Sequence, residues 1–389
     1  MEPKVKLLRI TTVPVSLNVL LRGQLAYVRS KGFDVITASA GGEEIDELVK
    51  REGVAHHIIP LTRKITPYQD FVSLWKLVAF IKKEKIQIVH SHTPKAGLIA
   101  MLAARIAGVR YRLHTVAGMP LMEASGIKRI LLKFTEKVTY WCSTRVYPNS
   151  YRLMDFIKTE ISNSQNKFHV IANGSSNGID TVYFRSTKSI VQQSELIKEQ
   201  LGLSKNDFVL TFIGRIVSDK GINELVEAFI TLQKECSRSI KLLLVGPYEN
   251  DLNPIYRTTK ESINDHPDII SVGFQEDVRP YFALTDLFVF PSYREGFPNV
   301  VLQSCAMGVP CIVSDINGCN EIIRHKETGL LVPAKDVNCL KKAMEEMIDN
   351  EELRNKFAEK GRKNVVLHYD QKYVWDQIIT EYRSMIKDV

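Results

Sequence analysis

The chain has 389 residues, 44% of them hydrophobic and 25% charged, and its formal net charge is +8. This length is too great for one ordinary domain and sufficient for two globular domains. No apolar run approaches the roughly 20 residues that cross a bilayer, and the interrupted apolar start does not resemble a secretory signal, so we expect a cytoplasmic chain. The basic residues are scattered and form no nucleic-acid-binding motif, so we expect no nucleic-acid partner.

Short apolar runs alternate with helical patterns through the first half of the chain. Helical patterns cover 18–32, 71–85 and 95–108, and the stretch 13–24 is expected to form the loop after the first strand. The expected strands lie near residues 5–11, 33–38, 54–60, 86–90, 110–115, 144–148 and 168–172. Continuous β-branched strands separated by helices predict an α/β fold with a parallel sheet covered on both faces.

The pattern loosens at the Gly/Ser/Asn-rich stretch 172–184 and stays polar to about residue 206. Three helical stretches then close the chain from about residue 336. Before them, strands are expected in the runs FVLTFIG, IKLLLVG, IISVG, LFVFPS, PCIVSD and GLLVP, between residues 208 and 333. We therefore expect two doubly wound, Rossmann-like domains, 1–180 and 181–370, which face each other across a ligand-binding cleft.

The first motif with chemical content is FIGRIVSDKGINELVEAF, residues 212–229. It runs from a strand, through Gly214, into a polar loop and then a helix. Arg215 and Lys220 lie in that loop near the helix N-terminus, where backbone N–H groups and the helix dipole also favour an anion. The motif therefore indicates a diphosphate site, although two solvated surface cations would give the same pattern.

A second motif, REGFPNVVLQSCAMGVPCIVSD, places Glu295 between a buried strand and an apolar helix. A carboxylate that only satisfied the helix dipole is one explanation. However, Pro298 already suits the start of the helix, and Glu295 precedes it by three residues. Since a carboxylate accepts hydrogen bonds from vicinal hydroxyls, the motif favours a sugar ligand.

Histidines at 90 and 92 alternate on the last residues of a strand and so share one face. No third metal ligand accompanies them, and we expect no bound metal and no cofactor. We expect them to shape the cleft instead, together with Lys95 at the start of the next helix.

The stretch 124–142 combines an apolar helical face (Ile127, Ile130, Leu131, Phe134, Val138) with basic residues (Lys128, Arg129, Lys133, Lys137). Docking on an anionic membrane surface and packing as an ordinary helix with a solvated basic face both fit this pattern. Six cysteines (Cys142, Cys236, Cys305, Cys311, Cys319, Cys339) form no C-x-x-C pair and are expected to be reduced core residues.

Taken together, these motifs resemble the retaining family-four glycosyltransferases of GT-B architecture, closest to those that extend lipid-linked glycans for bacterial capsule or O-antigen. The resemblance covers nearly the whole chain, including VHSHTPKAG (89–97), YPNS (147–150) and GFQEDVRPYFALTDLFVFPS (273–292). It implies that the final helix, 371–389, crosses back to the N-terminal domain.

The resemblance assigns roles position by position. Arg215 and Lys220 match the pair that stabilises the leaving nucleoside diphosphate, and Glu295 matches the acid that holds hydroxyls of the donor sugar. The remaining donor-binding positions implied are Gly214, Gly273, Phe274, Gly296, Phe297, Pro298, Asn299 and Gln303.

Two positions depart from the family pattern. Gln303 stands where the family has a second acid for the ribose hydroxyls, which keeps an acceptor oxygen and removes the charge, at a cost of about 1 kcal/mol. Ala117 stands where members commonly carry an active-site histidine; His114 lies three residues earlier and is an acceptor-side candidate or a core residue.

The resemblance implies retaining transfer of a hexose or N-acetylhexosamine from a UDP-sugar to a polyprenyl-diphosphate-linked glycan, at the inner face of the plasma membrane. The acceptor-side candidates in the first domain are Ser16 in the loop after the first strand, His92, Lys95 and His114. Only one strong acid is found, so the two-carboxylate dyad of retaining glycosidases is not expected. Two alternatives stay open: a UDP-sugar 2-epimerase, and a catalytically dead partner that only binds nucleotide sugar.

Overall fold

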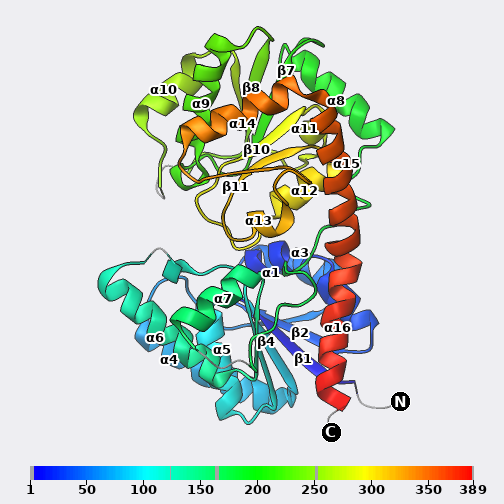
Figure 1. The fold of residues 1–389 in the computed structure, drawn as a ribbon. Helices are drawn as coiled ribbons and strands as arrows, with labels where there is room; N and C mark the ends of the chain where they lie inside the picture. The colour runs from blue at the N-terminus through cyan, green and yellow to red at the C-terminus, as the bar shows by residue number, and fades with distance from the viewer. Residues whose placement is uncertain (1–3, 123, 163–165, 250–252, 388–389) are drawn as a thin grey trace. The chain divides into compact units, whose positions relative to one another are not determined.

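The computed structural model describes residues 4–122, 124–162, 166–249 and 253–387. The chain divides into two compact units: unit 1 contains residues 1–178 and 371–389, and unit 2 contains residues 179–370. Figure 1 colours unit 1 from blue to green with a red final helix, and unit 2 from green to orange-red.

Unit 1 is built on a six-stranded parallel sheet with the strand order β3-β2-β1-β4-β5-β6. The strands are β1 (Lys6–Ile10), β2 (Asp34–Ser39), β3 (Ala55–Ile58), β4 (Ile88–Ser91), β5 (Tyr111–Val116) and β6 (Arg145–Pro148). The order reverses between β1 and β4, which makes their carboxyl ends the topological switch point where doubly wound sheets bind ligands.

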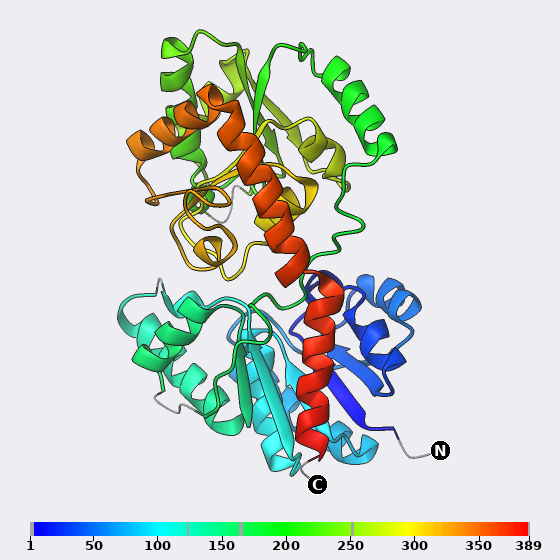
Figure 2. The same cartoon turned by 45° about the vertical axis from the view of Figure 1, so that its right-hand side comes forward.

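Helices cover both faces of this sheet. On one face, α2 (Gln24–Ser30), α3 (Glu44–Glu52) and α16 (Gln371–Lys387) pack against Leu7 and Ile88. On the other, α4 (Pro67–Glu84), α5 (Pro94–Ile106) and α6 (Gly126–Cys142) form a layer over Leu8 and Ile10, with α5 in the middle. Figure 2 shows α16 lying along the unit 1 sheet, as expected for the final helix. Unit 1 also contains α1 (Pro14–Leu20), η1 (Pro120–Met122) and α7 (Tyr151–Glu160).

Unit 2 repeats the architecture with the strand order β12-β11-β10-β7-β8-β9. Its strands are β7 (Phe208–Ile213), β8 (Ile240–Val245), β9 (Ile269–Gly273), β10 (Leu287–Phe290), β11 (Cys311–Ser314) and β12 (Leu330–Val332). All six residues of β7 are buried, as expected for a central parallel strand covered on both faces. The switch point lies between β7 and β10, and the two motifs with chemical content follow these two strands.

The helices of unit 2 enclose one continuous apolar core. They are α8 (Lys188–Gln200), η2 (Ser218–Lys220), α9 (Ile222–Glu235), α10 (Arg257–Asp265), α11 (Arg279–Ala283), α12 (Asn299–Met307), α13 (Cys319–Ile322), α14 (Val337–Asp349) and α15 (Glu351–His368). The predicted pair of doubly wound parallel sheets is therefore confirmed.

Four local predictions are wrong. The seventh strand expected near 168–172 is irregular and contributes only isolated bridges, one of them between Val146 and Phe168. Part of the expected loop 13–24 forms α1, and the helix expected over 18–32 is broken at Gly23. Finally, Cys236 and Cys339 are half-buried rather than core residues, although all six cysteines are free.

Candidate functional site

In unit 2 the loops after β7 and β10 are packed directly against each other. Gly221 ends the β7 loop with φ +72°, and a Cβ there would lie 2.1 Å from the carbonyl oxygen of Pro291 at the end of β10. Only glycine tolerates both that backbone conformation and that approach. The glycine of the DKG motif therefore holds the two loops together.

The close approach brings Lys220 and Glu295 into contact. The Lys220 ammonium donates to Glu295 Oε1, and the Ser292 hydroxyl donates to the same oxygen over 3.0 Å. Both charged side chains are 15% exposed, so one face of the pair remains accessible. A cation and an acid predicted from separate motifs thus form one partly buried pair at the switch point.

Arg215 takes a different direction. Its Nη1 pairs with Glu249 Oε2 at 2.5 Å, and its side chain is 46% exposed. Glu249 lies in the loop after β8, the strand next to β7. In this structure Arg215 therefore reaches toward the neighbouring loop, while Lys220 is held by Glu295.

A second ion pair, not anticipated from the sequence, fixes the same two loops. Arg294 Nη2 donates to Asp219 Oδ2 over 2.9 Å, and Asp219 is buried. The Asp219 carbonyl also accepts from the Tyr293 amide at 2.8 Å. Since Asp219 precedes Lys220 and Arg294 precedes Glu295, the Asp219–Arg294 pair sets the register of the Lys220–Glu295 pair.

Tyr293 extends this support to α9. Its hydroxyl donates to Glu224 Oε1 over 2.6 Å, and burial together with this carboxylate raises the pKa of Tyr293 well above its usual range. The phenol therefore stays protonated and keeps donating. The β10 loop is consequently tied both to the β7 loop and to the first turn of α9.

The turn after Glu295 is held from the other side by the loop after β11. Asn317 Nδ2 donates to the carbonyl oxygens of Glu295 and Gly296 at 3.0 and 3.1 Å. Gly318 lies so close that a Cβ there would be 2.5 Å from the Gly296 oxygen. These contacts fix the turn that leads into α12 through Phe297 and Pro298.

The other donor-side candidates occupy the ends of neighbouring elements. Asn299 and Gln303 lie on α12, exposed and half-buried respectively. Gly214 follows β7, and Gly273 ends β9, followed by Phe274, which is 73% exposed. The carboxyl ends of β7, β8 and β9 are adjacent in the sheet, because the Gly214 amide donates to the Val245 carbonyl over 2.9 Å and the Gly246 amide donates to the Gly273 carbonyl over 2.8 Å.

In unit 1, His114 is packed as a core histidine. Its Nδ1 lies 2.8 Å from the Ser91 hydroxyl, and a Cβ at Gly97 of α5 would approach its ring to 2.4 Å. Burial lowers the pKa of His114 to about 4, so the ring is neutral. These contacts account for His114 without a ligand.

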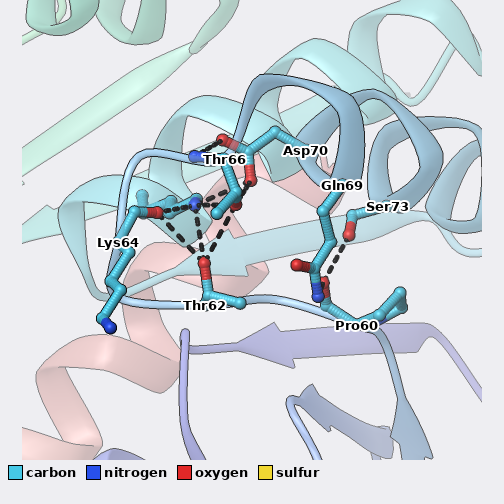
Figure 3. Close-up of polar contacts among 8 residues, drawn as sticks. Pro60, Thr62, Lys64, Thr66, Gln69, Asp70 and Ser73 are labelled. Carbon is cyan, nitrogen blue, oxygen red and sulfur yellow. Dashed lines mark hydrogen bonds and ion pairs between the residues drawn. The ribbon is translucent and has the colours of Figure 1, made fainter.

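Lys95 also has partners within its own unit, namely Thr62, Lys64, Thr66 and Asp70, which are labelled in Figure 3. Its ammonium pairs with Asp70 at 2.7 Å and donates to the hydroxyls of Thr62 and Thr66, each at 3.0 Å, and to the carbonyl of Lys64. The pairing fastens the 60–66 loop to the start of α5. Ser16, the remaining acceptor-side candidate besides His92, is half-buried on α1.

His92 is buried directly beyond β4. Its Nε2 accepts from Arg9 Nε over 2.9 Å, and its ring lies 4.3 Å from that of His90, centroid to centroid. Burial and the Arg9 charge lower the pKa of both rings well below the usual value, which leaves them neutral. Ala117 contributes its carbonyl to this region, where it accepts from Asn149 Nδ2 at 3.1 Å.

Two family models match this chain. One, described as glycosyl transferases group 1, matches residues 193–364, and one described as a glycosyl transferase 4-like domain matches residues 17–174. Among curated proteins, the capsular polysaccharide biosynthesis glycosyltransferase CapM of Staphylococcus aureus is 32% identical over 98% of both chains. An Escherichia coli UDP-Gal:alpha-D-GlcNAc-diphosphoundecaprenol alpha-1,3-galactosyltransferase is 30% identical over 85% of this chain and 84% of its own.

Solved structures show the same fold at lower identity. A glycosyltransferase from Rickettsia africae superposes with a TM-score of 0.81 at 21% identity, covering 99% of this chain and 100% of its own. Anabaena HepE in complex with UDP and glucose gives 0.80 at 17% identity, covering 98% of this chain and 100% of its own.

Proposed function

We infer that this chain, which belongs to the group 1 glycosyltransferases and has their GT-B fold, transfers a sugar from a UDP-sugar to a lipid-linked or saccharide acceptor in cell-surface polysaccharide synthesis. The observation that carries the proposal is the contact between Lys220 and Glu295 at the switch point of unit 2. A diphospho-sugar carries an anionic diphosphate next to sugar hydroxyls, so it suits a site in which a cation lies next to an acid that accepts hydrogen bonds.

In the proposed donor complex, Lys220 and Arg215 face the diphosphate and Glu295 accepts hydrogen bonds from sugar hydroxyls. Donor binding then replaces two carboxylate contacts by phosphate contacts, one from Glu295 to Lys220 and one from Glu249 to Arg215. The amides of Gly296 and Phe297 approach the donor, Gln303 accepts from a ribose hydroxyl, and Gly214, Gly273, Phe274, Pro298 and Asn299 line the remaining surface.

Transfer proceeds with retention in this proposal. The diphosphate leaves through a loose, oxocarbenium-like transition state, and the cations stabilise the negative charge that develops on it. The acceptor hydroxyl enters on the same face and passes its proton to the leaving phosphate oxygen. Positioning and charge stabilisation supply most of the rate enhancement, which suits a site with one acid.

UDP as the donor nucleotide is supported by the E. coli relative, whose name specifies UDP-Gal, and by the Anabaena structure with UDP and glucose. A polyprenyl-diphosphate-linked acceptor is supported by the same E. coli name and by a Campylobacter jejuni relative, 26% identical, named as acting on a diphospho-undecaprenol glycan.

Helix α6 supports access to such an acceptor at a membrane surface. Ile127, Ile130 and Phe134 are 86%, 71% and 63% exposed, whereas Val138 packs on the core. The cations Lys128 and Lys137 are exposed on the same helix. A helix with bare apolar residues flanked by cations fits peripheral binding to an anionic bilayer at the cytoplasmic face. No helix in the described ranges has the length and apolarity to span a bilayer.

The test is a donor screen followed by transfer. Thermal shifts with UDP-, GDP- and ADP-sugars identify the donor, and we expect the largest shift with a UDP-sugar. That donor is then incubated with a lipid-linked N-acetylglucosaminyl diphosphate, and the anomeric ¹H coupling of the product reports retention. Isomerisation of the donor without acceptor would indicate an epimerase instead. Binding with neither transfer nor donor hydrolysis would indicate a dead partner.

A further inference from the structure

Unit 1 contains a fully buried cation whose partners are all neutral. Arg9 of β1 is 1% exposed and donates through Nε to His92 Nε2, through Nη1 to the Tyr382 hydroxyl at 3.0 Å, and through Nη2 to Gln24 Oε1. A guanidinium has no acceptor capacity, so each of these three groups must accept from Arg9. Arg9 therefore fixes the direction of every hydrogen bond around it.

These hydrogen-bond directions also determine which ring nitrogens of His90 and His92 carry a hydrogen. Since Tyr382 accepts from Arg9, its own hydrogen is free to be donated to His90 Nδ1, 2.6 Å away, and His90 Nε2 then donates to the Thr115 hydroxyl at 2.7 Å. Since His92 Nε2 accepts from Arg9, the single hydrogen of the neutral His92 ring must be on Nδ1. His92 Nδ1 is therefore a donor, and it is buried without a partner in the described structure.

An acceptor without a partner lies in the same place. Asn149, directly after β6, is 5% exposed, and its Nδ2 donates to the Ala117 carbonyl, which orients the amide. Its Oδ1 is buried and, within the described residues, no donor reaches it. The Ser176 hydroxyl oxygen is also buried and has no hydrogen-bond partner among the described residues. His92, Asn149 and Ser176 all line one hollow, which we name the hydroxyl pocket; Arg9, Gln24 and Thr115 also contribute to its wall.

The hydroxyl pocket has a volume of about 20 Å³. About 10–15 Å³ is enough for one water-sized group. The occupant must accept from His92 Nδ1–H and donate to Asn149 Oδ1, which a hydroxyl does and a phosphate or carboxylate does not. The pocket lies beyond β4 and β6, at the carboxyl edge of the sheet where doubly wound folds bind ligands.

We propose that the hydroxyl pocket is an acceptor subsite that binds one hydroxyl of the acceptor glycan between His92 and Asn149, with water in its place when the acceptor is absent. The inference rests on the proposed function and assigns a recognition chemistry to the acceptor side. Arg9 acts in it as a positioning residue, because it sets the His92 tautomer and does not itself need to touch the glycan.

Monodeoxy acceptors test the proposal in a double-mutant cycle. The probes are a short-chain lipid diphosphate carrying N-acetylglucosamine and its monodeoxy analogues, assayed with the full chain, Asn149→Ala and His92→Phe. The analogue without the nucleophilic hydroxyl is inert with every variant and is set aside. One other analogue lacks the hydroxyl that the pocket binds. With the unmodified chain, we expect kcat/KM for this analogue to be about 10- to 100-fold below that for the parent acceptor, because KM rises. Asn149→Ala should show no further fall in kcat/KM when the parent acceptor is replaced by this analogue.

His56→Phe is the matched control. His56 also sits on the unit 1 sheet with a lowered pKa of about 4, but bonds Thr37 and Ser39 outside the pocket. It should show the same deoxy penalty as the unmodified chain. If, for every analogue, the loss of kcat/KM caused by the missing hydroxyl and the loss caused by the Asn149→Ala substitution were additive, the pocket would hold water only, and the proposal would be overturned.

A spectroscopic arm separates this result from failure of the proposed function. If the parent acceptor is not glycosylated at all, the transferase proposal fails, and the imidazole ¹⁵N spectrum of the full chain still decides about the pocket. His92, assigned by its loss in His92→Phe, should appear as the neutral Nδ1–H tautomer, and its signal should move when the parent acceptor is added in micelles. A His92 signal that stays unmoved at saturating acceptor, or an Nε2–H tautomer, would contradict the proposal.

Discussion

Lys220 and Glu295 are each 15% exposed, and at this burial each charge offsets part of the desolvation penalty of the other, whereas either charge alone would destabilise the fold. Without ligand the two side chains neutralise each other and hold their rotamers. A diphospho-sugar offers a replacement partner to each, anionic phosphate to the ammonium and hydroxyl hydrogens to the carboxylate. The pair is therefore preorganised for the ligand that we propose.

The first prediction concerns Lys220. Lys220→Ala should lower kcat by about 10²- to 10³-fold, because the departing diphosphate loses a preorganised cation. Lys241→Ala is the matched control, since Lys241 forms an ion pair with Asp268 at similar exposure, 21% and 22%. Steady-state kinetics and circular dichroism should show a folded protein in both cases and full activity only in the control.

Glu136 on α6 gives a prediction about stability. It is 6% exposed, and burial raises the pKa of its carboxyl from 4.5 to about 7. Between these values the folded chain keeps a proton that the unfolded chain releases, so stability falls as pH rises from about 4.5 to about 7. Glu136→Gln should remove this loss and be more stable than the unmodified chain by about 1–3 kcal/mol at pH 8.

The same comparison at about pH 4.5, the ordinary pKa of a glutamate carboxyl, should show almost no difference between the Glu136→Gln variant and the unmodified chain. Thermal unfolding at both pH values measures the effect. An equal gain at the two values would mean that the benefit of the Glu136→Gln substitution does not come from ionisation.

For single residues, type and spacing in the sequence indicated which ones belong to the site but could not indicate where long side chains point. The DKG and EGFP motifs carried Lys220 and Glu295, which the structure brings together. Glu249 and Asn317 carried no local signal, because their partners are more than 20 residues away. Asp219 and Arg294 were visible only as neighbours of the predicted residues.

Among the elements, the loops after β7 and β10 behave as one assembly. The Asp219–Arg294 pair and the Gly221 contact connect them directly, and the Tyr293 bond to Glu224 ties the β10 loop to α9, the helix that follows the β7 loop. Such redundancy suits a site in which a small displacement between cation and acid would weaken binding of one ligand.

The role of the Asp219–Arg294 ion pair can be tested by substituting Arg294, whose side chain is 49% exposed. Arg294→Met should raise KM for the donor and lower kcat, together about 10- to 100-fold, because Lys220 and Glu295 lose their register. Arg294→Lys keeps a charge for Asp219 and should recover most of the activity. If the Met and Lys variants were equally impaired, the guanidinium would have another role than pairing with Asp219.

Elements set by long-range packing were the ones that the sequence could not specify. Gly23 ends one helical pattern and starts another, and a Cβ there would lie 2.8 Å from the Trp375 ring of α16, a residue more than 350 positions away. The region 168–172 has strand-like composition, yet only Phe168 bridges to β6. By contrast, β7 (FVLTFI) and β10 (LFVF) of unit 2 are fully buried and almost entirely apolar, and this local pattern was enough to predict them.

Considering the whole molecule, the exposed apolar residues of α6 give a prediction about location. The double variant Ile130→Ser/Phe134→Ser should lose most of its binding to vesicles containing anionic lipid, because apolar insertion and cation attraction act together. Val191→Ser/Leu196→Ser is the control, since both residues are exposed on α8 of unit 2. Equal flotation of the two double variants would remove α6 as the membrane contact.

Calorimetric titration of UDP and of the UDP-sugar selected by the donor screen shows directly whether Lys220 and Glu295 bind the two parts of the donor. Lys220→Ala should weaken both ligands about 10- to 100-fold, because both contain the diphosphate. Glu295→Gln should weaken the UDP-sugar about 10-fold and leave UDP unchanged or slightly tighter, since Lys220 is released from its carboxylate. If Glu295→Gln weakened the binding of UDP and of the UDP-sugar equally, or weakened neither, Glu295 would not be holding the sugar, which would contradict the proposed donor site.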